Sequence, residues 1–196
     1  MPNEDTIGRV VGETNASNFQ FTVEDGEEPA VFEYVKLKIN DEENGERTEK
    51  PVLAQVTDIQ RRDPAMEDGT PIEAIETVSE QGLNNTNTIA TAQVIGYLSP
   101  TGITRPRHAA RPGTPVKKAP DSFLEDFVTV DRRGLEIGPM LTRESVTAEL
   151  DIAGLNRHLA ILAATGAGKS HTAGVIIEEL LENNASVLAV DPHGDY

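Results

Sequence analysis

The sequence predicts a β plus α/β protein with three parts. These are a small N-terminal β-barrel over residues 1–98, a proline-rich basic linker over residues 99–120, and the start of an α/β domain with a parallel sheet over residues 121–196. Short runs of β-branched and aromatic residues recur in the first part and indicate strands. In the last part an apolar run, a glycine-rich loop and an amphipathic segment follow one another, which is the order of a βαβ unit.

The barrel is predicted from five runs, each bounded by Gly, Asn, Asp or Glu residues that favour turns. They cover residues 7–12, 19–23, 31–39, 51–56 and 91–98. Short strands at this spacing are typical of a barrel. The polar stretch over residues 61–87 is expected to be a long loop with one short helix near residues 72–80.

The linker is predicted from five prolines and two glycines between residues 99 and 120, a composition that favours a semi-rigid connection. This segment also carries five cations and no acidic residue: Arg105, Arg107, Arg111, Lys117 and Lys118. It is interpreted either as a basic strap that contacts DNA phosphates or as a connector whose charge complements acidic domains nearby. The connector is the favoured interpretation.

The α/β part is predicted element by element. Apolar residues at helical spacing indicate a helix near residues 123–128, and residues 135–141 and 146–152 read as two strands, the second with strict alternation. The apolar run 158–163 is expected to be a strand, residues 169–183 an amphipathic helix, and residues 186–190 a buried parallel strand. Strand, loop, helix and strand then form one βαβ unit.

Composition restricts the class of protein. The chain has no cysteine, which excludes disulfides and thiolate zinc sites and suits a reducing cytoplasm. Its longest apolar stretch, residues 159–164, is far shorter than a membrane helix. The formal net charge of −16 is spread along the whole chain, which indicates a halophilic protein whose surface stays hydrated in concentrated salt. An ordinary acidic cytosolic protein is the alternative.

The segment Ala163-Ala-Thr-Gly-Ala-Gly-Lys-Ser170 has the spacing of a phosphate-binding loop. Successive backbone N–H groups and a helix N-terminus would surround a polyphosphate, Lys169 would reach the β- and γ-phosphates, and the Ser170 hydroxyl would bind Mg²⁺. A glycine turn without a ligand is the alternative. The predicted ligand is ATP with Mg²⁺, and the predicted binding residues are Ala164, Thr165, Gly166, Ala167, Gly168, Lys169, Ser170 and His171.

Acidic residues follow the last predicted strand in the sequence Asp191-Pro-His-Gly-Asp-Tyr196. Ligands of parallel sheets bind beyond the carboxyl ends of the strands, so these side chains are expected to face the γ-phosphate. Asp191 is a candidate for ordering Mg²⁺ and Asp195 for positioning water, while His193 is a candidate for contacting phosphate or a neighbouring subunit. The alternative is an acidic turn that caps a following helix.

Residues 157–171, followed after one helix by residues 187–196, resemble the HerA family of archaeal DNA-translocating ATPases, which is related to FtsK. Residues 7–13 are similar to the opening strand of the HAS barrel of that family. The resemblance implies a RecA-like P-loop domain, and the acidic composition suggests a haloarchaeal member. Gly166, Gly168, Lys169 and Ser170 match the family's phosphate and magnesium ligands, and Asp195 stands where the family usually has glutamate.

The resemblance also implies a homo-hexameric ring that moves double-stranded DNA and works with a NurA-type nuclease. Such an enzyme needs a second acidic strand motif and an arginine finger. The 196 residues are therefore expected to be the N-terminal portion of a longer enzyme and to lack DNA-dependent ATP hydrolysis on their own. One alternative is a barrel that docks a nuclease or a subunit. Another is a different loop NTPase, although the chain lacks the Asn-Lys-x-Asp motif of GTPases.

Overall fold

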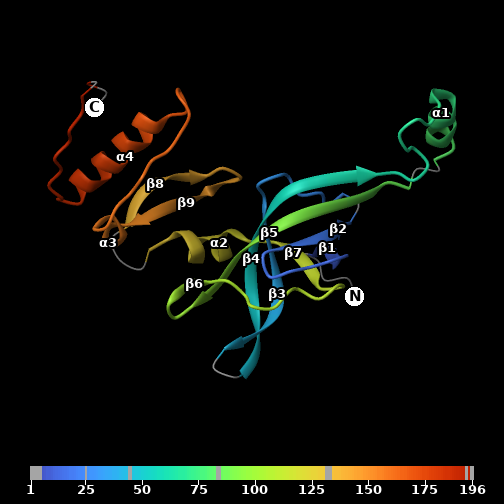
Figure 1. Cartoon of the computed structure of the whole chain (residues 1–196), viewed down its shortest axis with the longest axis horizontal. Helices are drawn as coiled ribbons and strands as arrows, with labels where there is room; N and C mark the ends of the chain where they lie inside the picture. The colour runs from blue at the N-terminus through green and yellow to red at the C-terminus, as the bar shows by residue number, and fades with distance from the viewer. Residues whose placement is uncertain are drawn as a thin grey trace. The chain divides into compact units, whose positions relative to one another are not determined.

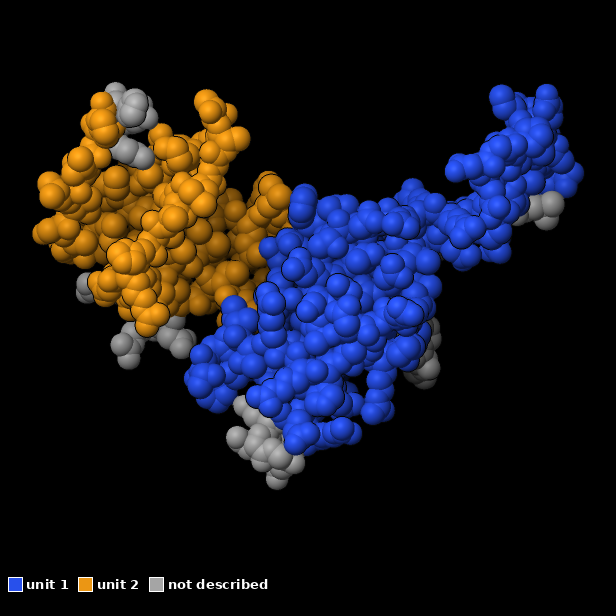
Figure 2. All heavy atoms as spheres, viewed as in Figure 1, with its two compact units in different colours: residues 1–119 blue, residues 120–196 orange. Residues whose placement is uncertain are grey.

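The computed structural model describes residues 6–24, 26–43, 46–82, 85–130, 134–192 and 194. The chain divides into two units, Met1–Ala119 and Pro120–Tyr196, which Figure 2 shows in different colours. Each unit has its own β-structure and its own buried side chains, so each is described by itself.

The first unit is a closed antiparallel barrel of six strands (Figure 1). The strands are β1 (Thr6–Val11), β2 (Asn18–Val23), β3 (Tyr34–Glu43), β4 (Glu46–Arg62), β5 (Asn87–Ser99) and β7 (Pro115–Lys118). Their order is β2-β1-β7-β3-β4-β5, and pairing of β2 with β5 closes the barrel. A short strand, β6 (Gly102–Thr104), is added to β5. The predicted barrel is confirmed.

Alternation of side chains along the strands fills the barrel interior. In β2, Phe19 and Phe21 are buried while the residues between and beside them are exposed, because successive side chains point to opposite faces of a strand. Val10 lies opposite Phe21 in the register of β1 and β2, and both side chains are buried. At Gly8 a Cβ atom would collide with the Thr22 carbonyl, so the close approach of these two strands requires glycine.

The structure corrects the prediction that residues 99–120 are a linker, because β6 and β7 lie within that segment. β7 lies between β1 and β3 and pairs with both of them, with Val116 opposite Gly8 on one side and Leu37 on the other. Val116 is completely buried. A single apolar residue among prolines and lysines gave no periodic signal, yet it fills one position of the barrel core. Pro115 starts the strand, a position where a missing N–H is tolerated.

β4 and β5 extend beyond the other strands, and the predicted helix lies at their far ends (Figure 1). This helix, α1 (Ile72–Glu80), has the predicted position but buries none of its residues. β3 begins three residues later than predicted, because residues 31 and 32 form a turn in which Phe32 has a positive φ of 72°. Propensity alone does not show where such a turn interrupts an apolar run.

The second unit contains a two-stranded antiparallel sheet of β8 (Gly134–Met140) and β9 (Arg143–Asp151). The helix α2 (Asp121–Val128) contacts β9 and buries Leu124, while α4 (Lys169–Glu182) contacts β8 and buries Ile176. A single turn of helix, α3 (Ile152–Leu155), follows β9, and the Asp151 side chain accepts a hydrogen bond from the Ala153 N–H at its start. Among the described helices, none has the length and apolar character needed to cross a membrane.

The predicted parallel sheet does not form within the described residues. Residues 158–163 and 186–190 are neither strands nor helices, and Leu162, Leu188 and Val190 are 89%, 90% and 86% exposed. Parallel strands occur in sheets that are covered on both faces, and a two-stranded sheet is marginal in water. Both apolar runs therefore lie at the predicted positions, but neither pairs with a strand among the described residues.

Candidate functional site

The predicted phosphate-binding loop lies directly before α4. Gly168 is the N-cap of this helix and has a φ of 85°, while Gly166 has a φ of 80°. Between them, the Ala167 N–H donates a hydrogen bond to the Ala164 carbonyl at 3.1 Å, which closes a tight turn. Both glycines hold left-handed backbone angles that cost an L-residue about 1–2 kcal/mol, so the turn depends on glycine at these two positions.

The first turn of α4 presents donors and a positive charge. The 14-residue helix begins at Lys169 and has no acidic residue in its first turn. Its N-cap, Gly168, has no side chain that could cap the first N–H groups. The Gly168 carbonyl accepts hydrogen bonds from the Thr172 N–H at 2.9 Å and from the Thr172 hydroxyl at 3.2 Å. These bonds fix the loop to the helix, whose N-terminal dipole favours an anion.

The loop has the space and the chemistry for a polyphosphate. A Cβ atom at Gly166 or Gly168 would have no neighbour within 4 Å, so backbone angle rather than crowding demands glycine, and the loop surface is open. Residues 162–169 are all exposed. Backbone N–H groups, the Lys169 ammonium and the Ser170 hydroxyl form a set of groups suited to phosphate oxygens and Mg²⁺. Ala163 keeps a negative φ, so alanine there causes no backbone strain.

The structure brings some of the other predicted residues into the same unit. Ser170 is half-buried in the first turn of α4, and His171 beside it is exposed. Asp191 is half-buried and follows the run 186–190, which Figure 1 shows turning back along α4. Asp195 and His193 lie outside the described residues. The proximity of Asp191, His193 and Asp195 to the loop remains a prediction.

The barrel contains a polar pair that the sequence analysis did not single out. Asp41 on β3 is 1% exposed, and its Oδ1 lies 2.8 Å from Nδ1 of His108. Both carboxylate oxygens also accept from the Arg107 N–H, at 3.2 and 3.3 Å. The partners are more than 60 residues apart in the chain, so no local pattern joins them; the only sequence signal was the basic character of residues 105–118.

The pKa of Asp41 reflects two opposing effects. Burial raises the pKa, because it disfavours the charged form. Hydrogen bonds from His108, from the N–H groups of Arg107 and Glu42 and from the Tyr97 side chain outweigh burial, so the pKa of Asp41 lies below its ordinary value of 3.8. The buried carboxylate is therefore ionised at neutral pH and holds His108 in one orientation.

Two family models match the chain, one in each unit. Residues 7–106 match the HAS barrel domain, and residues 135–196 match the central domain of helicase HerA. The first match covers most of the barrel, and the second covers β8, β9, the phosphate-binding loop and α4.

Curated relatives agree with these matches. A protein of Methanocaldococcus jannaschii named a probable helicase is 36% identical over 100% of this chain and 37% of its own length. The DNA double-strand break repair helicase HerA of Pyrococcus furiosus is 39% identical over 62% of this chain and 22% of its own length. The protein of the same name from Saccharolobus solfataricus is 32% identical over 74% of this chain and 29% of its own length. The chain thus spans between about a fifth and two fifths of the length of these relatives.

Proposed function

Because this chain belongs to the HerA helicase family, with a HAS barrel followed by HerA central-domain sequence, we propose that it binds ATP with Mg²⁺ through residues 164–171. In this proposal the chain supplies the nucleotide-binding part of an ATP-driven translocase that moves double-stranded DNA in end processing and repair. The observation that carries the proposal is the loop in front of α4, with left-handed angles at Gly166 and Gly168 and open space before it.

Each residue of the loop has a distinct role in the proposed site. The N–H groups from Ala164 to Lys169 donate to the phosphate oxygens, and the Lys169 ammonium neutralises the β- and γ-phosphates. This arrangement orients the γ-phosphate for attack by water, since phosphoryl transfer depends mainly on positioning and electrostatic stabilisation. Asp195 is the proposed water-positioning residue.

The metal requires oxygen ligands. Ser170 and Asp191 are the proposed holders of Mg²⁺, because a hydroxyl and a carboxylate are ligands that this hard cation prefers. Bound Mg²⁺ would neutralise developing charge on the phosphates. Without a cation, Asp191 would repel the polyphosphate that Lys169 attracts.

We further propose that residues 158–163 and 186–190 are strands of a RecA-like parallel sheet in the assembled enzyme. Their exposed apolar side chains support this, since surfaces of this kind mark sites that another element covers. The proposed assembly is a cytoplasmic homo-hexamer that encloses double-stranded DNA and works with a NurA-type nuclease.

Isothermal titration of the 196-residue chain with ATP in the presence of Mg²⁺ tests nucleotide binding. The wild type is expected to bind saturably and Lys169→Ala to lose most of the affinity, because the charge-assisted contacts to the phosphates disappear. Lys118→Ala is the matched control, since this barrel lysine is exposed and its ion pair with Glu27 is long, at 3.8 Å. Equal binding by Lys169→Ala and the control would contradict the proposal.

A second candidate function is a barrel that docks a nuclease or a neighbouring subunit while the α/β unit stays inactive. The observation that favours it is the exposure of apolar side chains beside one another where β5 meets β6: Leu98, 42% exposed, lies opposite Ile103, 51% exposed. In that case Lys169→Ala would leave every binding property unchanged, so the same titration separates the two candidates.

A further inference from the structure

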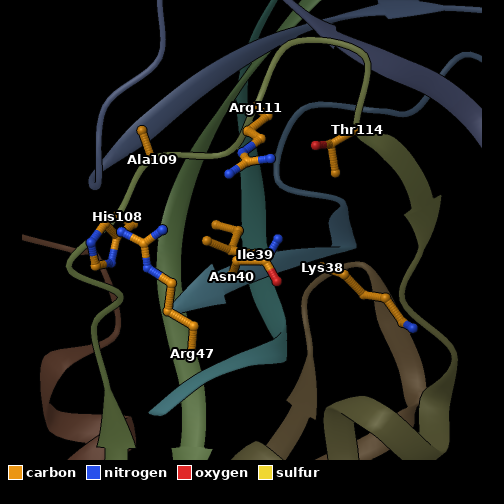
Figure 3. Close-up of a pocket in the computed structure, with 8 residues that line it drawn as sticks. All are labelled: Lys38, Ile39, Asn40, Arg47, His108, Ala109, Arg111 and Thr114. Carbon is orange, nitrogen blue, oxygen red and sulfur yellow. The ribbon is translucent and has the colours of Figure 1, made fainter. Parts of the chain in front are cut away.

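A cavity of about 190 Å³ opens on the barrel and belongs to no part of the phosphate-binding loop. Its walls come from β3, from the start of β4 and from the segment between β6 and β7 (Figure 3). The lining residues are Lys38, Ile39, Asn40, Arg47, His108, Ala109, Arg111 and Thr114. Since a water occupies about 30 Å³ of liquid, the cavity has room for several waters or for one polyatomic anion.

The lining includes the cationic side chains of Lys38, Arg47 and Arg111, and none of the described lining residues is acidic. Figure 3 shows the guanidinium group of Arg47 beside the His108 ring, the guanidinium group of Arg111 at the other side of the cavity, and Lys38 extending away. Lys38 is already engaged, because its Nζ lies 2.7 Å from Oε2 of Glu49. Among the residues that the structure describes, neither Arg47 nor Arg111 forms an ion pair.

Two guanidinium groups facing one space repel each other unless an anion lies between them. This arrangement is notable in a chain with a formal net charge of −16, in which carboxylates are plentiful. The other exposed arginines of β4 illustrate the contrast: Arg61 pairs with Glu28 and Arg62 pairs with Glu67. On β4, therefore, Arg61 and Arg62 are neutralised by carboxylates, whereas Arg47 in the cavity forms no ion pair among the described residues.

His108 is held in place from behind. Its Nδ1 lies 2.8 Å from the buried Asp41 carboxylate, which also accepts from the Arg107 N–H and so fixes the backbone at this point. Because Nδ1 is committed to Asp41, the second ring nitrogen, Nε2, is the one left for a ligand.

We propose that this cavity binds a phosphate group, held by the guanidinium groups of Arg47 and Arg111 and by Nε2 of His108, with Asp41 as the positioning residue. Arginine suits this ligand because its planar fork donates two parallel hydrogen bonds to phosphate oxygens. The phosphate is either free or part of a nucleic-acid backbone. The segment from Arg105 to Lys118, which carries five cations and no acidic residue, extends the positive charge beyond the cavity and suits a backbone.

The test uses the whole 196-residue chain in low-salt buffer without phosphate. Inorganic phosphate is titrated while the ring resonances of His108 are followed by NMR, with sodium chloride of equal ionic strength as the control for screening. Arg47→Gln and Arg111→Gln are each expected to weaken phosphate binding about tenfold or more, because each removes a charge-assisted pair of hydrogen bonds. Both side chains are exposed, so these variants keep the fold. Arg62→Gln, on the same strand as Arg47 but outside the cavity, is expected to change the affinity less than about twofold.

A short DNA duplex then identifies the source of the phosphate. Displacement of bound phosphate by the duplex, with the same His108 shifts, supports a nucleic-acid backbone; binding of phosphate without any effect of the duplex supports a free phosphate. No saturable shift with either probe, or equal responses of Arg111→Gln and Arg62→Gln, overturns the proposal. Binding of a polyglutamate peptide alone also overturns it and assigns the cavity to carboxylates. Lys169→Ala leaves the cavity intact. Failure of the phosphate proposal can therefore be distinguished from failure of the nucleotide-binding proposal.

Discussion

In the barrel each of the six closing strands pairs with a neighbour on both sides, whereas the two apolar runs that flank α4 form no strand. Both regions contain residues that favour strands, so propensity does not explain the difference. The barrel supplies every partner within residues 6–118, including a four-residue strand from a proline-rich segment. Beside α4, the described residues supply neither the neighbouring strands nor the cover on both faces that a parallel sheet needs.

The largest expected effect tests whether β7 is part of the barrel. Val116→Asp would bury an unpaired charge between β1 and β3, so the free energy of unfolding should fall by at least about 3 kcal/mol. Urea unfolding followed by tyrosine fluorescence measures this, since Tyr34 and Tyr97 both lie on barrel strands.

Ile103→Asp is the matched control, because it introduces the same side chain in the same segment at a position that is 51% exposed. Its effect should stay within about 0.5 kcal/mol. Equal, small effects of both substitutions would show that residues 99–120 are a connector after all and would remove the contrast between the two units.

The sequence predicted those elements whose signal is local. Runs of β-branched and aromatic residues located β2 and β5, helical spacing located α2, and the glycine spacing located the loop before α4. The strand at Val116 was missed because one apolar residue has no period, and the pair of Asp41 and His108 was missed because only the closed barrel brings them together. Residues 186–190 were predicted as a strand because their apolar composition favours burial. Composition does not show whether a neighbouring strand is present to pair with them.

A second prediction concerns the effect of nucleotide on the phosphate-binding loop. At ATP concentrations about 100 times the dissociation constant, binding should stabilise the loop by about 2.7 kcal/mol against local opening. Hydrogen exchange measured by mass spectrometry should therefore slow by roughly 100-fold in peptides that cover residues 164–172, while the barrel strands stay unchanged. Lys169→Ala should show no protection. Uniform slowing across both units would contradict a site confined to the loop.

A third prediction concerns the buried carboxylate of the barrel. Asp41→Asn should cost about 1–3 kcal/mol at pH 7, since it weakens hydrogen bonds that the charged group accepts from His108 and Arg107. The folded-state pKa of Asp41 is lowered, so this stabilisation is present above the unfolded value near 3.8 and is lost as the pH falls through the lower folded value.

The difference in unfolding free energy between wild type and Asp41→Asn should therefore shrink as the pH falls below about 3.8. Asp58→Asn is the control, because Asp58 is exposed and its bond is to the neighbouring exposed Gln60. A constant difference between wild type and Asp41→Asn from pH 7 to pH 2 would show that the charge of Asp41 contributes nothing to the barrel.

The smallest expected effect concerns charge, which the two units share. With a formal net charge of −16, carboxylates repel one another across the surface, and raising the ionic strength from about 0.1 M to about 1 M shortens the Debye length from about 10 Å to about 3 Å. The unfolding temperature should rise by a few degrees as KCl is added. Replacing Glu73, Glu76 and Glu80 of α1 by Gln should reduce that rise, because this helix buries no residue and the change removes repulsion without touching the core. An unfolding temperature that stays constant or falls with KCl would contradict a surface adapted to salt, and it would leave the acidic composition as a matter of solubility alone.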